Sequence, residues 1–209
     1  MDTVLYLIRH GATAANLAKP ALLQGRKHNP PLAPLGIRQA QATRDFLAIR
    51  PMDACYCSPL QRAAQTAAIV VESHHLVPIA IPDLTECDVG RWEGLDWHTI
   101  RQQDPSEYEL HMSSPGKHGY PDGESFAEVY DRVAPVIDDL LLTHEGQSLL
   151  IVAHNAVNRT YLAGLLGLGA DQARQVVLDN CGISVVIRKG SRTTVATLNA
   201  AFHLQGVAA

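Results

Sequence analysis

The chain has 209 residues, of which 46% are hydrophobic and 18% are charged, a composition typical of a globular protein with a substantial core. Its 17 basic and 21 acidic residues give a net charge of −4, and no long basic run occurs, so we expect no binding to nucleic acid or to an anionic membrane. The first apolar stretch lacks a preceding basic region and is interrupted by Arg9 and His10, so we expect neither a signal peptide nor a membrane span. The four cysteines lack the CxxC spacing of zinc sites and predict reduced packing residues in a cytoplasmic protein.

Strand-like runs alternate with helical patterns along most of the chain. The strands are expected at Thr3–Ile8, Asp53–Cys57, Val77–Ile81, Ser148–Ala153, Gly182–Arg188 and Thr193–Asn199. This alternation predicts an α/β fold, a three-layer sandwich with a mostly parallel central sheet and helices on both faces. Residues 90–123 are rich in Trp, His, Pro, Ser and Gly, with one short helical pattern near Asp96–Gln103. We interpret them as a lid or insertion within a single domain of residues 1–209.

The first long helical pattern runs over residues 35–50. Its apolar positions recur on one helical face and are Leu35, Ala42, Phe46 and Ile49. This pattern predicts that the helix buries these four side chains against the sheet.

Local signals predict where two further helices begin. Ser58 suits an N-cap and Pro59 suits the first helical position of the helix after the second strand. Ser125 and Glu128 form a capping-box pattern before a later helix. Pro135 lies inside that later helix and is expected to kink it or to shift its boundary.

Reactive side chains follow several of the predicted strands. Arg9 and His10 end the first strand, and His154 separates the strand Ser148–Ala153 from a predicted helix over residues 155–166. Arg62 lies in the first turn of the helix after the second strand, and Glu86 follows the third. In open parallel sheets, ligands bind beyond the carboxyl ends of the strands, so we expect these side chains to lie close together.

These five residue types suit phosphoryl transfer. Arg9 and Arg62 can each hold phosphate oxygens in a bidentate fork. A neutral imidazole at His10 is a competent nucleophile toward phosphorus, and His154, if protonated, adds positive charge. Glu86 can protonate the leaving oxygen. Each residue alone is more often structural than catalytic, so the interpretation depends on their joint placement at strand ends.

The chain resembles the histidine phosphatase superfamily, the phosphoglycerate mutase-like group named for its RHG motif. The matching segments follow in order over almost the whole chain: RHGATAAN (9–16), LQG (23–25), PLAPLGIRQAQ (31–41), SPLQRAAQT (58–66), TECDVGRWEGL (85–95), PDGES (121–125), VAHN (152–155) and DNCGI (179–183). The resemblance implies a phosphorylated nucleophile at His10, a phosphate pocket of Arg9, Arg62 and His154, and a proton donor at Glu86. It also implies that no metal and no cofactor are needed.

The resemblance extends to the mouth of the pocket, where Asn16, Gln24 and Gly25 are expected to contact phosphate or substrate. The chain departs from the common family pattern at three positions. Ala12 follows RHG where a glutamate or glutamine is frequent, and Ala33 replaces a helix-opening threonine. Asn155 follows His154 where glycine is common, which adds a side chain near the pocket. None of the three removes a group that the chemistry requires.

Within this family, the sequence favours a phosphatase that acts on a small phosphomonoester, because residues 90–123 lack the arginine-rich loop of the glycolytic mutases. Arg91 and Arg101 are the only arginines of this segment. A mutase-type phosphoryl transfer remains an alternative. A non-catalytic phosphate-binding protein is a third reading, although such a protein is expected to have lost one of the five central residues. A nucleotide-dependent enzyme is disfavoured, because GLLGLG at 164–169 is neither GxGxxG nor a P-loop. The sequence leaves a homodimer open.

Overall fold

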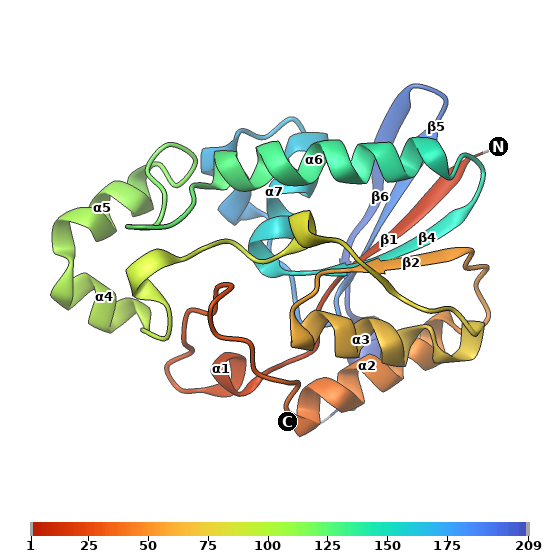
Figure 1. Ribbon diagram of the computed structural model, residues 1–209, viewed down its shortest axis with the longest axis horizontal. Helices are drawn as coiled ribbons and strands as arrows, with labels where there is room; N and C mark the ends of the chain where they lie inside the picture. The colour runs from red at the N-terminus through yellow and green to blue at the C-terminus, as the bar shows by residue number, and fades with distance from the viewer. Residues whose placement is uncertain (1, 208–209) are drawn as a thin grey trace.

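The computed structural model describes residues 2–207, which form a six-stranded sheet between layers of helices (Figure 1). The strands are β1 (Thr3–Arg9), β2 (Ala54–Cys57), β3 (Ile79–Ala80), β4 (Ser148–Ala153), β5 (Ile183–Lys189) and β6 (Arg192–Ala200). Their order across the sheet is β3-β2-β4-β1-β5-β6. The strands β1 to β4 pair in parallel, whereas β5 pairs antiparallel with both β1 and β6. The predicted three-layer α/β sandwich with a mostly parallel sheet is confirmed.

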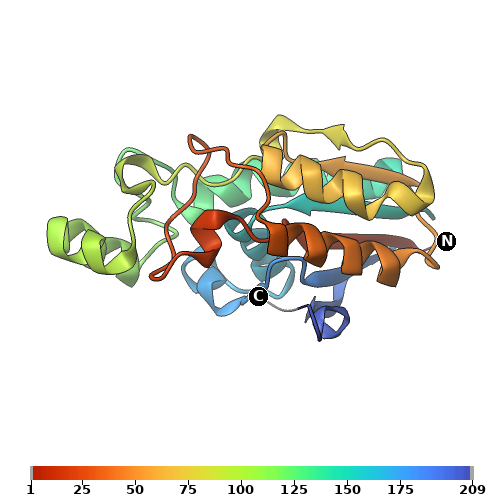
Figure 2. The ribbon, with the colours of Figure 1, turned by 90° about the horizontal axis from the view of Figure 1, so that it is seen from below.

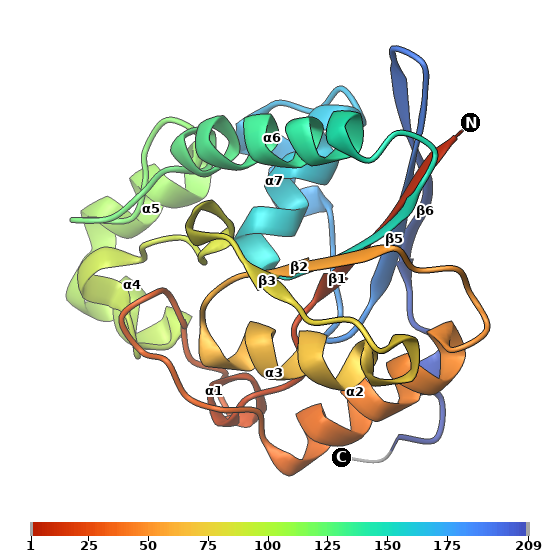
Figure 3. The same ribbon diagram turned by 45° about the vertical axis from the view of Figure 1, so that its right-hand side comes forward.

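The helices lie on both faces of this sheet and beyond one of its ends. The α-helices are α1 (Ala14–Leu17), α2 (Pro34–Leu47), α3 (Gln61–Val70), α4 (Trp97–Gln103), α5 (Pro105–Ser113), α6 (Phe126–Thr143) and α7 (Asn155–Leu165). Short 3₁₀ turns occur at Glu72–His74, Pro82–Leu84, Gly90–Trp92, Ala170–Gln175 and Phe202–Leu204. Figures 1 and 3 show α2 and α3 on one face and α6 and α7 on the other. Figure 2 shows α4 and α5 projecting at the end opposite the N-terminus. Among the residues described, no helix is long and apolar enough to cross a membrane.

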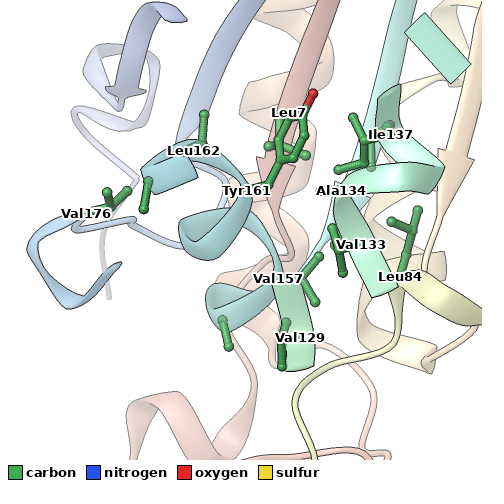
Figure 4. Packing of buried hydrophobic residues seen from close by; sticks show 14 of the residues in the cluster. Leu7, Leu84, Val129, Val133, Ala134, Ile137, Val157, Tyr161, Leu162 and Val176 are labelled. Atoms are coloured by element: carbon green, nitrogen blue, oxygen red, sulfur yellow. The ribbon is translucent and has the colours of Figure 1, made fainter. Parts of the chain in front are cut away.

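The central strands are buried on both faces, which explains their continuous apolar sequences. In β1, Leu5 and Leu7 belong to the core under α6 and α7, whereas Tyr6 and Ile8 belong to the core over α2 and α3. Side chains at successive strand positions point to opposite faces, so one apolar run supplies both cores. Figure 4 shows residues of the first core, with Tyr161 of α7 beside Leu7.

The capping box predicted for α6 is present. The Ser125 hydroxyl accepts a hydrogen bond from the backbone N–H of Glu128 (3.2 Å), and the Glu128 carboxylate accepts one from the backbone N–H of Ser125 (2.7 Å). The helix then runs through Pro135 to Thr143, so the expected shift of its boundary does not occur. Burial of the long apolar face of α6 offsets the loss of one backbone hydrogen bond at the proline.

The apolar face predicted for α2 is wrong. Phe46 and Ile49 are 44% and 90% exposed, and Ile49 lies beyond the end of the helix. The buried positions of α2 are instead Gly36, Ala40, Thr43 and Leu47. A glycine is required at position 36 because a Cβ there would collide with the backbone of Ala12, in the turn after β1. The helix also begins as the sequence indicates, with Pro34 at its first turn and no side-chain cap from Ala33.

The predicted start of α3 and the predicted length of β3 are also wrong. Helix α3 begins at Gln61 with no side-chain cap, and Ser58 lies three residues before it. The Ser58 hydroxyl accepts the backbone N–H of Leu60 (3.2 Å), before the helix, and also contacts a buried histidine, as described below. Strand β3 has only two residues because it lies at the sheet edge, where Val77 is 83% exposed and lacks a core to pack against.

The segment 90–123 contains two helices, of which the sequence predicted only the first. Helix α4 matches the expected Asp96–Gln103 pattern, and the Asp96 carboxylate caps it by accepting the N–H groups of His98 and Thr99. Helix α5 buries only His111, so its sequence shows no amphipathic period.

Candidate active site

The carboxyl ends of β1, β2 and β4 meet at one edge of the sheet. Parallel pairing sets Arg9 opposite Ala153 and Cys57 opposite Val152. The backbone N–H of His10 then donates to the carbonyl of Ala153 (3.0 Å), which is followed directly by His154. The two predicted site histidines therefore face each other, with ring centroids 5.2 Å apart.

His10 is held as a neutral imidazole with one nitrogen free. Its Nδ1 lies 2.8 Å from the carbonyl oxygen of Gly11. A carbonyl can only accept, so Nδ1 carries the hydrogen and Nε2 keeps its lone pair. Within residues 2–207, this Nε2 has no hydrogen-bond partner. Burial, together with the charges of Arg62 and Arg9, lowers the pKa of His10 well below its usual value.

Two buried arginines supply positive charge beside His10. The Arg9 guanidinium donates to the carbonyl of Leu178 (2.7 Å), and burial lowers the pKa of Arg9 to about 10, so it stays charged at neutral pH. Arg62 is fully buried and donates to the carbonyls of Gly25 (2.9 Å) and His28 (3.3 Å). The Nε of each arginine is buried without a hydrogen-bond partner, so each guanidinium keeps an unused donor.

His154 is fully buried and is oriented by Ser58, whose Oγ lies 2.7 Å from its Nε2. Burial and the nearby Arg62 lower the pKa of His154 well below its usual value. The protonated form of His154 is therefore disfavoured in the free protein, and the positive charge that the sequence suggests for this position stays a prediction.

Glu86 projects into the site from the segment after β3. Its Oε1 accepts the backbone N–H of Cys87 (2.8 Å), and its Oε2 accepts the backbone N–H of Asn155 (3.1 Å), the first residue of α7. The N-terminus of α7 thus fixes the carboxylate at the cavity wall.

The structure brings all nine predicted site residues together around one cavity of about 350 Å³. Six of them line its wall, namely Arg9, His10, Asn16, Gln24, Glu86 and Asn155. Gly25, Arg62 and His154 lie behind that wall. The Gln24 Nε2 and the Asn155 Oδ1 are buried without hydrogen-bond partners, so each retains capacity to bind a polar ligand.

Sequence reasoning missed the residue that shapes the loop before α2. The Glu93 carboxylate accepts the backbone N–H groups of Gly25 (3.2 Å), Lys27 (3.2 Å) and His28 (2.7 Å). The carbonyls of Gly25 and His28 are the acceptors that hold Arg62. No local pattern in the sequence links Glu93 to a loop that lies 65 or more residues away.

Two arginines of the cavity wall, Arg159 and Arg174, were also missed. Arg159 follows Asn155 by four positions on α7, so helical periodicity could have placed both on one face. Arg174 lies in the 3₁₀ turn Ala170–Gln175, whose sequence has no such signal. Over the described part of the chain, no group of three or more His, Cys, Asp or Glu residues could hold a metal ion.

Comparison with known proteins agrees with this geometry. The sequence profile of the histidine phosphatase superfamily (branch 1) matches residues 5–201. A putative phosphoserine phosphatase 2 from Hydrogenobacter thermophilus is 30% identical over 200 residues, covering 95% of this chain and 96% of the relative. A 2-carboxy-D-arabinitol-1-phosphatase from Triticum aestivum is 34% identical over 86% of this chain, which spans only 36% of that protein.

A solved structure shows the same fold. The structure of a putative alpha-ribazole-5'-P phosphatase from Escherichia coli superimposes with a TM-score of 0.85 at 30% identity, covering 95% of this chain and 96% of that one. The family profile, the relatives and the fold agree, so the chain belongs to the histidine phosphatase superfamily.

Proposed function

We propose that the protein hydrolyses small phosphomonoesters through a phosphohistidine at His10, without a divalent metal. The observation that carries the proposal is the unpartnered Nε2 of a neutral, buried imidazole, at the wall of a cavity that Arg9 also lines. The relatives described above are named as phosphatases, which supports hydrolysis as the reaction.

In the first step, the Nε2 of His10 attacks phosphorus, and the N–P bond forms as the P–O bond to the leaving group breaks. Arg9 and Arg62 stabilise the charge on the phosphoryl oxygens. Glu86, in its protonated form, gives its proton to the leaving oxygen, which departs as an alcohol. The Ser58–His154 pair fixes the imidazole opposite His10.

In the second step, water enters in place of the alcohol. The Glu86 carboxylate accepts a proton from this water as its oxygen attacks phosphorus, and the N–P bond breaks. His10 returns to its neutral form, Glu86 is protonated again, and inorganic phosphate leaves. The backbone N–H groups of Cys87 and Asn155 keep the carboxylate in place for both proton transfers.

We further propose that residues 90–123 form the lid of a single domain that spans residues 1–209. Trp97 and Tyr120 from this segment line the cavity, which supports a role in covering the substrate. In contrast, Trp92 is buried in the interior of the segment itself. A cytoplasmic location is supported by four cysteines that are all free and buried, and the net charge of −4 supports a small-molecule partner rather than nucleic acid.

A panel of phosphomonoesters tests the proposed reaction. The protein is incubated with each ester in the presence of a chelator, and released phosphate and any phosphorylated acceptor are both measured. We expect phosphate release that the chelator does not suppress. A strict requirement for a divalent metal would refute the proposed mechanism. Transfer of the phosphoryl group to a second metabolite without release of phosphate would show that the protein is a mutase.

A further inference from the structure

Glu86 lies in a stretch of chain that has no regular secondary structure of its own. Residues 85–89 form neither helix nor strand and lie between the 3₁₀ turns Pro82–Leu84 and Gly90–Trp92. The backbone groups of such a stretch need partners elsewhere in the fold, because an unpaired buried N–H or C=O costs free energy. A group that donates and accepts protons must also lie within hydrogen-bond reach of the reacting atom. The partners of this stretch therefore decide how well Glu86 is placed.

Arg132 of α6 binds the backbone of this stretch at two points. Its guanidinium donates to the carbonyl of Asp83 through Nη1 and to the carbonyl of Glu86 through Nη2 (3.4 Å). The second acceptor belongs to the proposed proton donor itself. Arg132 is not among the residues that line the cavity. Its effect on the site therefore passes through the backbone that it holds.

Glu124, two residues before α6, holds the same stretch at its other end. Its Oε2 accepts the backbone N–H of Asp88 (2.8 Å), and its own backbone N–H donates to the carbonyl of Asp88 (2.8 Å). The two carboxylate oxygens also accept Nε and Nη2 of Arg132 (2.9 and 3.1 Å). Such a two-contact pair of arginine and carboxylate has a defined geometry, and both side chains here are less than one-fifth exposed. Arg132 and Glu124 thus form one rigid support.

Glu124 stays ionised in this support. Burial opposes its ionisation, but the hydrogen bonds from Arg132 and from the N–H of Asp88 outweigh burial and lower the pKa of Glu124 below its usual value. The carboxylate also forms an ion pair with Arg26, whose loop holds Arg62 through two carbonyls. The support therefore joins the stretch that carries the proton donor to the loop that holds the phosphate-binding arginine.

We propose that Arg132 and Glu124 are positioning residues that place the carboxylate of Glu86 against the leaving oxygen. The pair brackets residues 83–88 by holding the carbonyls of Asp83 and Glu86 at one end and the N–H of Asp88 at the other. It transfers no proton and does not contact phosphate. This inference rests on the proposed function, since it explains how the proton donor of that site is held.

Two esters with different leaving groups isolate the proton transfer. An alkoxide is a strong base, so an alkyl phosphate such as glycerol 3-phosphate needs a proton as its P–O bond breaks. The p-nitrophenolate ion is a weak base and leaves p-nitrophenyl phosphate without a proton. The measurement is the ratio of kcat/KM for the alkyl ester to kcat/KM for the aryl ester. This ratio excludes the later hydrolysis of phosphohistidine, and the amount of active protein cancels from it.

The ratio is measured for the wild-type protein, Glu86→Gln, Arg132→Gln and Glu124→Gln. Arg44→Gln is the matched control. Arg44 of α2 also contacts carboxylates, those of Asp45 (2.9 Å) and Glu72 (2.8 Å), but it does not line the cavity or contact residues 83–88.

We expect Glu86→Gln to lower the ratio by about 100-fold, the low end of the contribution of general acid catalysis. Arg132→Gln and Glu124→Gln should each lower it by roughly tenfold, because a misplaced proton donor loses part of that contribution. Arg132→Lys keeps the charge without the fork of donors and should recover only part of the loss. The control should keep the wild-type ratio. Equal falls with both esters in Arg132→Gln and Glu124→Gln would overturn the inference, since a merely structural role affects both esters alike.

The double variant Glu86→Gln with Arg132→Gln tests whether Arg132 acts through Glu86. We expect it to hydrolyse the alkyl ester as fast as Glu86→Gln alone, because no proton donor remains to be placed. A further tenfold fall in kcat/KM would overturn the inference by showing that Arg132 acts on another part of the site.

A crystal structure of Arg132→Gln separates this inference from the proposed function, and Glu124→Gln replaces it if Arg132→Gln does not fold. We expect the Glu86 carboxylate to lose its contact with the backbone N–H of Cys87 or of Asn155. An unmoved carboxylate would overturn the positioning role while leaving the phosphatase intact. A displaced carboxylate, together with no phosphate release by the wild-type protein from any ester, would support the positioning role and refute the phosphatase.

Discussion

Replacing Glu93 with glutamine tests whether the loop before α2 positions the phosphate site. Glu93 belongs to the segment 90–123 and accepts three backbone N–H groups from residues 25–28. Two carbonyls of that same loop hold the guanidinium of Arg62. Glu93→Gln keeps the shape of the side chain but removes its charge. The new amide NH2 group then faces backbone N–H groups, and two donors cannot form a hydrogen bond with each other.

The size of the effect follows from these contacts. A hydrogen bond to a charged group contributes about 1.5–3 kcal/mol, and a side chain that is only partly buried lies at the low end of that range. The amide retains one acceptor oxygen, so we expect a net loss of ~1–2 kcal/mol in the ordering of the loop. A factor of ten in rate corresponds to about 1.4 kcal/mol, so kcat/KM should fall roughly 5- to 30-fold.

The assay is the release of phosphate from one ester of the panel, measured with wild-type protein, Glu93→Gln and the control Glu109→Gln. Glu109 lies in α5 with its side chain 67% exposed, so its charge change leaves the loop untouched. The control should match the wild-type protein. A Glu93→Gln enzyme with wild-type kcat/KM would show that the loop does not depend on this carboxylate, and the proposed coupling to Arg62 would be wrong.

Two further predictions concern stability. Burial lowers the pKa of His10, His154 and His111, the last to about 4, so below pH 6.5 the unfolded chain binds more protons than the folded one. Denaturant titrations from pH 7 to pH 5 should therefore show the free energy of unfolding falling by up to about 1.4 kcal/mol per pH unit for each histidine. A free energy of unfolding that does not change over this pH range would refute this prediction. Gly36→Ala should lower stability by ~1–3 kcal/mol through the clash with the turn after β1, as measured by chemical denaturation. Gly169→Ala, at a position with open space and a negative φ, is its control and should change stability little.

Sequence patterns predicted the sheet well and predicted that His10 and His154 follow neighbouring strands, for a physical reason. The central strands are buried on both faces, so their apolar runs stand out, and His10 and His154 directly follow such runs. Parallel pairing then brings those strand ends together, whatever the details of the helices. The roles assigned to His10 and the other site residues remain predictions that the experiments above test.

The remaining features depend on packing between distant segments. The buried face of α2 includes Gly36 because the backbone of the turn after β1 approaches that position closely, which hydrophobicity cannot show. Ser58 resembles a helix cap but contacts His154, which is 96 residues away. Glu93 and Arg174 also contact residues that are distant in the sequence, 68 and 62 positions away, so a single sequence provides no periodic signal for either contact.

Trapping the phosphorylated protein tests the central claim most directly. The wild-type protein is mixed with a radiolabelled phosphomonoester, quenched with denaturant, and divided between acid and alkali. We predict a label on the protein that acid removes and alkali leaves intact, as expected for phosphohistidine, and that His10→Ala abolishes. A label that survives His10→Ala, or one that alkali removes, would contradict the assignment of His10 as the nucleophile.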